Sequence, residues 1–125
     1  MIDELDPDTE WVRADEITMM GAKFVPVGEL RKVNVKGINL CISRKGDQLF
    51  AMRDRCPHAG GPLHQGSVDE EGNVMCPWHR FKFCPEDGKS AAGEGYATET
   101  FPVQIHPEGT YIGFPKRKRK WWELF

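Results

Sequence analysis

The sequence contains no long apolar run. Nowhere in its 125 residues is there a stretch close to the roughly 20 uncharged apolar residues that a membrane-spanning helix needs. The first residues are acidic and lack the apolar core of a secretory signal. We therefore expect no membrane span and a cytoplasmic location. A sustained 3.6-residue apolar period is also missing, which argues against a helical fold.

A basic face is absent as well, although basic residues are not. Five acidic groups lie in residues 1–10, five consecutive bases occupy 116–120, and the formal net charge is −2. A nucleic-acid-binding domain would carry its basic residues on one face, so we expect no nucleic-acid partner. Residues 116–125 are read first as a solvated end. The alternative is a docking arm, in which bases steer an acidic partner and Trp121 and Trp122 anchor it.

The sequence is rich in turn residues and in short segments that read as strands. Thirteen Gly and nine Pro punctuate the chain. Residues 31–44 read as a hairpin around Lys36-Gly37, and Lys45-Gly46-Asp47 leads into a strand at 49–53. Residues 100–106 and 110–114 read as a later hairpin, with short strands near 73–75 and 80–84 between them. The fold class is therefore all-β.

One domain fits this length. We expect an acidic, flexible N-terminus over 1–10 and a single domain over 11–115. Within that domain a loop-rich insert spans about 54–95, and a basic and aromatic tail follows over 116–125.

Two short motifs in the insert carry the chemistry: Cys56-Pro-His58 and Cys76-Pro-Trp-His79. Each supplies one thiolate and one imidazole, whereas a zinc finger pairs its cysteines in one knuckle and its histidines in another. The mixed loops suit a cluster with one sulfur-ligated and one nitrogen-ligated iron. Gly60 and Gly61 allow tight turns beside such a cluster.

The double motif, with Gly-Gly-Pro-Leu after its first half and Pro-Trp inside its second, resembles the Rieske ferredoxin family. The resemblance implies stacked antiparallel sheets with an inserted cluster-binding subdomain. It also implies one Rieske-type [2Fe–2S] cluster per chain. Cys56 and Cys76 would bind the buried iron, while His58 and His79 would bind the outer iron, with a ring edge toward solvent where electrons leave.

Departures from the cytochrome bc type narrow the function. That type carries an extra cysteine in each loop, where this chain has Gly61 and Trp78. It also has hydrogen-bonding Ser and Tyr where this chain has Phe81 and Phe83. Fewer donors leave a reduced cluster less stabilised, so we expect a low potential. A low potential suits delivery of electrons to an oxygenase.

We therefore expect an electron carrier, not an enzyme, that passes single electrons from a flavin-dependent reductase to a terminal oxygenase. A monomer is the expected state. An oxygenase subunit is excluded because a mononuclear iron site needs two further histidines and a carboxylate. Only His64 and His106 remain, on opposite sides of the insert. The alternatives are a Rieske-like small subunit of a nitrite-reductase-type complex and a zinc-binding module.

The remaining cysteines and histidines have plainer readings. Cys41 reads as a buried strand residue and Cys84 as structural packing near the second loop. His106 reads as a strand-end residue. For His64 we favour a surface position over one close to the cluster that influences docking.

Overall fold

The computed structural model describes residues 9–14, 17, 24–26, 28–56, 60–77, 81–91 and 97–115. Within these residues the chain forms three antiparallel sheets and one short 3₁₀ helix, η2 (Leu63–Gln65). The all-β prediction is therefore confirmed. None of the helical segments in the described ranges is long and apolar enough to cross a membrane. Residues 1–8 and 116–125 lie outside these ranges, so the expectations for them remain predictions.

The first sheet joins the two ends of the described chain. Its order is β1 (Thr9–Arg13), β10 (Gly109–Pro115) and β9 (Val103–His106). Thr9 lies opposite Pro115, so the first and last described residues of the chain lie at the same end of this sheet.

The second sheet has the order β2 (Arg31–Val35), β3 (Ile38–Lys45), β4 (Gln48–Arg53) and β8 (Thr100–Phe101). The two predicted hairpin turns at 36–37 and 45–47 are confirmed. The expected continuous strand over 100–106 is wrong, because Pro102 divides it. Proline has no N–H to give to a ladder, so β8 pairs with β4 while β9 pairs with β10.

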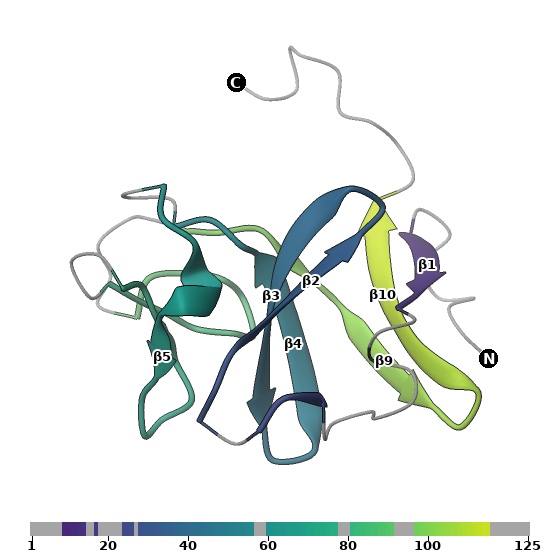
Figure 1. The fold of residues 1–125 in the computed structure, drawn as a ribbon, viewed down its shortest axis with the longest axis horizontal. Coiled ribbons are helices and arrows are strands. Elements are labelled where there is room, and N and C mark those ends of the chain that lie inside the picture. The colour runs from purple at the N-terminus through teal and green to yellow at the C-terminus, as the bar shows by residue number, and fades with distance from the viewer. Residues whose placement is uncertain are drawn as a thin grey trace, which may run out of the picture.

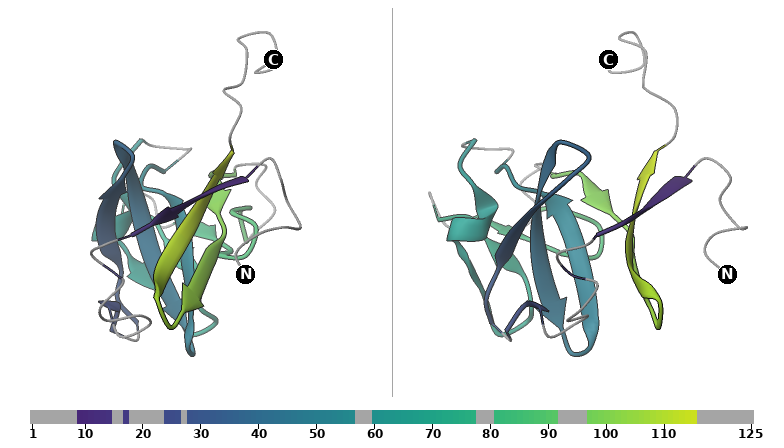
Figure 2. Two further views of the ribbon diagram at one scale, coloured as in Figure 1. Left: turned by 90° about the vertical axis from the view of Figure 1, so that its right-hand side faces the viewer. Right: turned by 45° about the vertical axis from the view of Figure 1, so that its right-hand side comes forward.

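The third sheet belongs to the predicted insert. It contains β5 (Ser67–Val68), β6 (Val74–Met75) and β7 (Lys82–Phe83), in that order. Figure 1 shows the β2–β4 sheet in the middle, with the β5 region on one side and β9 and β10 on the other. The right-hand view of Figure 2 shows the same arrangement. The second sheet is thus covered on both faces.

Strand β3 explains why two cores form. Leu40 and Ile42 point into a core shared with the first sheet, which also contains Ile112 and Phe114. Cys41 points to the opposite face, into a second core under the insert. Alternation along the strand was predicted, but the second face is buried as well as the first because the insert packs on it.

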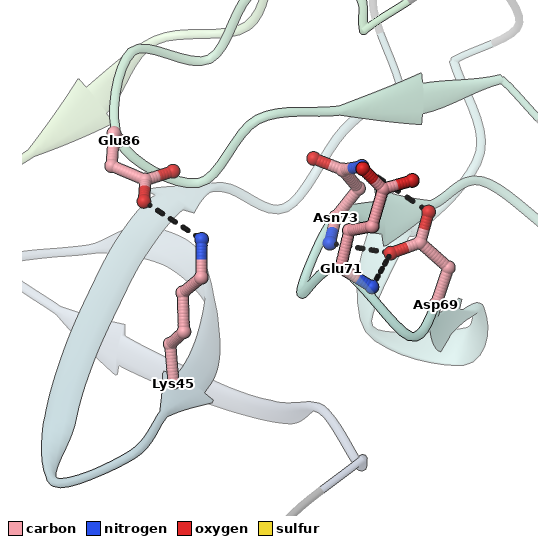
Figure 3. A network of polar contacts seen from close by, with 5 residues as sticks. All are labelled: Lys45, Asp69, Glu71, Asn73 and Glu86. Carbon is pink, nitrogen blue, oxygen red and sulfur yellow. Dashed lines mark hydrogen bonds and ion pairs between the residues drawn. The ribbon is translucent and has the colours of Figure 1, made fainter.

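Polar contacts fasten the insert to the second sheet and to itself (Figure 3). Lys45 Nζ at the end of β3 lies 3.0 Å from Glu86 Oε2 in the turn after β7. Asp69 accepts hydrogen bonds from the backbone N–H groups of Glu71 and Asn73, each at 2.9 Å. It also pairs with Lys82 Nζ at 3.2 Å, which joins the β5–β6 turn to β7.

Candidate metal centre

Cys56 and Cys76 each begin a loop that is closed by the same hydrogen bond. The N–H of Cys56 donates to the carbonyl oxygen of Gly61 at 2.8 Å, and the N–H of Cys76 donates to that of Phe81 at 2.8 Å. Each bond spans five residues and encloses the proposed histidine ligand of its own motif. In the first loop Gly60, at a φ of +77°, also donates its N–H to the carbonyl oxygen of Cys56 at 2.7 Å. The two motifs therefore sit on two loops of matching construction.

Gly66 and Ser67, which follow the first loop, lie directly beside Met75, the residue before the second loop. Ser67 pairs with Met75, and Met75 pairs with Lys82 beyond the second loop. A Cβ at Gly66 would lie 1.8 Å from the carbonyl oxygen of Met75, so only glycine permits this approach. This close packing holds η2 and the first loop against β6, which ends at Met75, one residue before Cys76.

The two thiols share one apolar environment. Cys56 is 1% exposed and Cys76 is 0% exposed, and both belong to the core under the insert. Its other buried members are hydrophobic or sulfur-containing: Cys41, Met52, Leu63, Val74 and Phe83. Paired soft thiolates in a water-excluding pocket fit an iron–sulfur cluster, since cysteine thiolates hold such clusters and burial tunes them.

The proposed imidazole ligands, His58 and His79, lie outside the described residues. In the part of the chain that the structure does describe, no group of three or more His, Cys, Asp or Glu residues gathers at a metal-binding distance. The structure thus brings Cys56 and Cys76 into one cluster of buried side chains, and the four-residue ligand set stays a prediction.

His64 lies half-buried, not fully exposed at the surface. Its ring is 26% exposed, and its Nδ1 lies 2.6 Å from Oδ2 of Asp54, whose side chain is only 3% exposed. The backbone N–H of His64 donates to Oδ1 of the same carboxylate at 2.7 Å. Ten residues separate the two, and no local pattern signals the contact. The expected surface position is therefore only partly right, because Asp54, two residues before Cys56, covers part of the ring at the start of η2.

Cys41 and His106 lie where the sequence predicted them, and the packing role of Cys84 stays a prediction. Cys41 is fully buried, and burial, assisted by the charge of Asp54, raises the pKa of its thiol. Cys84 is half-buried; desolvation, followed by the charges of Asp87 and Glu86, raises its pKa. His106 ends β9, with its Nε2 lying 2.9 Å from Gln104 Oε1. None of these groups has the electropositive, exposed surroundings of a reactive site.

Phe81 and Phe83 line the same core. Phe83 is fully buried in it and Phe81 packs against it partly buried. Neither phenyl ring can donate a hydrogen bond to sulfur. Gly61 is buried, and Trp78 lies outside the described residues. Neither position holds a cysteine, so the disulfide of the cytochrome bc type is missing from this chain.

Comparisons with known proteins agree with this architecture. A profile of the Rieske [2Fe-2S] domain matches residues 15–103. The chain is 27% identical over 95 residues to the 3-phenylpropionate/cinnamic acid dioxygenase ferredoxin subunit of Escherichia coli strain K12, covering 74% of this chain and 87% of that protein.

Solved structures resemble it too. A chain in the complex of reduced oxygenase and oxidised ferredoxin in carbazole 1,9a-dioxygenase matches with a TM-score of 0.68 and 26% identity, over 88% of this chain and 96% of that one. A putative NADH-dependent nitrite reductase small subunit from Mycobacterium tuberculosis shares the fold, with a TM-score of 0.69 at 18% identity, over 85% and 96% of the two chains. Because the profile spans more than half of the sequence, the chain belongs to the Rieske [2Fe-2S] domain family, whose domain implies a [2Fe–2S] cluster.

Proposed function

We propose that this chain is a ferredoxin that accepts single electrons from a flavin-dependent reductase and delivers them to a terminal oxygenase. The single observation that carries the proposal is the pair of buried thiols, Cys56 and Cys76, on loops closed by the same hydrogen bond. The likeness to dioxygenase ferredoxin subunits supports the choice of partners.

Four residues would hold the cluster: Cys56, His58, Cys76 and His79. When bound, the cluster supplies a centre that takes up and releases one electron at a time. The thiols would anchor it from the buried side, as the family resemblance implies, and the imidazoles would hold the side nearer to solvent.

The rest of the chain keeps that centre dry and rigid. Leu63, Val74 and Phe83 exclude water from the thiol side, because all three are fully buried there. The hydrogen bonds from Cys56 and Cys76 fix both loops at their base. Stiff loops limit the rearrangement that accompanies each gain or loss of an electron.

Reconstitution tests this proposal. The purified protein is reduced by a flavin-dependent reductase and NADH, and its reoxidation is followed with an oxygenase component in the presence and absence of the oxygenase substrate. We expect reduction by the reductase and reoxidation that depends on the oxygenase. A protein that carries zinc in place of iron and sulfide would contradict the proposal.

A second function, as the small subunit of a nitrite-reductase-type complex, is favoured by one observation, the shared fold with the Mycobacterium tuberculosis protein. Copurification separates the two. Stable association with a sirohaem enzyme favours the subunit, and transient electron delivery to an oxygenase favours the carrier.

A further inference from the structure

Arg55 is a surface cation that lies against the loop closed by Cys56 and Gly61, which we call the first metal loop. The residue is exposed and immediately precedes Cys56. Its Nε and Nη2 each lie 3.9 Å from the position that a Cβ would take at Gly60. Its backbone is held on both sides, since its N–H donates to Arg53 at 2.7 Å and its carbonyl oxygen accepts from Thr98 Oγ1 at 3.5 Å.

The carboxylates of Asp54, the residue before Arg55, and of Glu99, which pairs with Arg53, already have partners. Both oxygens of Asp54 accept hydrogen bonds from His64. Glu99 Oε1 accepts from Nε and Nη2 of Arg53 at 3.2 and 2.7 Å. Arg55 itself has no carboxylate within ion-pair distance among the described residues.

Most surface cations of the described chain do have such a partner. Ion pairs occupy Arg31, Lys36, Arg44, Lys45, Arg53 and Lys82. Arg55 is thus an uncompensated guanidinium at the loop from which electrons would leave. A guanidinium presents a planar fork of N–H donors that fits a carboxylate.

We propose that Arg55 is a contact for the redox partner, and that the partner surface it meets carries carboxylates. The inference rests on the proposed electron-carrier function. Its charge would favour encounters that bring an acidic surface to the first metal loop, and its fork would fix the orientation of the complex.

Two cobalt complexes of opposite charge test this with the holoprotein. [Co(EDTA)]⁻ is an anion coated with carboxylates and stands in for an acidic surface, whereas [Co(NH₃)₆]³⁺ is a cation. In each reaction one electron leaves the reduced protein and converts Co(III) to Co(II). At an ionic strength of about 0.1 M, charges farther than about 10 Å are largely screened, so the rates report the local surface.

Arg55→Glu should slow oxidation by [Co(EDTA)]⁻ at least about twofold and accelerate oxidation by [Co(NH₃)₆]³⁺. Both effects should fade at about 1 M salt. Arg55→Lys should restore most of the rate because it restores the charge. The matched control is Arg13→Glu, which reverses the charge of another exposed guanidinium that has no ion pair among the described residues. Arg13 lies on β1 in the first sheet, on the other side of the second sheet from the insert. Midpoint potentials of all variants allow comparison at equal driving force.

A second readout does not involve electron transfer. Phenylglyoxal attacks accessible, unpaired guanidinium groups, and peptide mapping by mass spectrometry identifies the modified residue. Arg55 should react faster than Arg53, which is paired with Glu99. Equal reactivity of the two, or cobalt rates that Arg55→Glu and Arg13→Glu change alike, would overturn the inference while leaving the carrier function intact. A purified protein without a cluster would overturn both.

Discussion

His64 and Asp54 make a double contact: the backbone N–H and the ring Nδ1 of His64 reach the two oxygens of one buried carboxylate, at 2.7 and 2.6 Å. Asp54 also donates its own N–H to the carbonyl oxygen of Asn39 at 3.0 Å. One residue therefore ties β3, the approach to the first metal loop and the start of η2 together.

Asp54→Ala should lower the free energy of unfolding of the holoprotein by about 2–3 kcal/mol. The substitution leaves a partly buried backbone N–H and imidazole without their shared acceptor, and hydrogen bonds to charged groups are worth more than neutral ones. Urea unfolding measures the change. The control is Asp47→Ala, at an exposed carboxylate, which should stay within about 0.5 kcal/mol. Equal losses in the two variants would contradict the role of Asp54.

Asp69 predicts a stability difference that depends on pH. Burial alone would raise the pKa of this carboxyl, but hydrogen bonds from Asn73, Lys82 and Glu71 outweigh it and lower the pKa to about 2, from an ordinary 3.8. A depressed folded-state pKa stabilises the fold fully above pH 3.8, and this stabilisation is lost as the pH falls toward 2.

Asp69→Asn should accordingly be less stable than the wild type at neutral pH. The gap should narrow below about pH 4 and close only below about pH 2, where both proteins carry a neutral side chain at position 69. Urea unfolding at a series of pH values measures this difference in the free energy of unfolding between the two proteins. A gap that stays constant from pH 7 to pH 2 would contradict the account.

Thiol labelling should report the bound cluster. In the holoprotein we expect iodoacetamide to leave Cys41 unmodified, since it is buried and its pKa is raised, and to modify Cys84 slowly. Cys56 and Cys76 are buried as well, but their two loops should open once acid and a chelator remove the metal that holds them together, so we expect both thiols to become reactive in the metal-free protein. Peptide mapping identifies the sites. Equal labelling of Cys56 and Cys76 before and after metal removal would show that they are not ligands.

The potential should fall at the low end of the range of about −150 to +300 mV known for Rieske centres. Phe81 and Phe83 occupy places beside the thiol core from which a hydroxyl could have stabilised the reduced cluster. Phe83→Tyr adds such a donor and should raise the potential, whereas Phe83→Leu should not. Redox titration measures all three proteins. A wild-type value above about +100 mV would rule out this reading.

Much of the β-sheet fold could be predicted because its turns and strands depend on patterns among neighbouring residues. The turn at 36–37 and the alternation of Leu40, Cys41 and Ile42 are written in neighbouring residues. The family was recognisable because the two motifs place one cysteine and one histidine each at the spacing that the Rieske family uses for its proposed cluster ligands. The two buried thiols then followed from that assignment.

What could not be predicted depends on contacts between distant segments. Nothing near Asp54 indicates that its carboxylate will hold His64. The double burial of β3 arises only when the insert folds onto the second sheet. The strand expected over residues 100–106 is divided at Pro102 because its two parts pair with different strands, β8 with β4 and β9 with β10.

Pulsed EPR of the dithionite-reduced protein tests the central claim most directly, because it detects nitrogen nuclei coupled to a reduced iron–sulfur cluster. A cluster held by Cys56, His58, Cys76 and His79 predicts coupling to two imidazole nitrogens, with one coupling lost in His58→Cys or His79→Cys variants that retain a cluster. A reduced cluster without nitrogen coupling, or a protein with no iron signal at all, would contradict it.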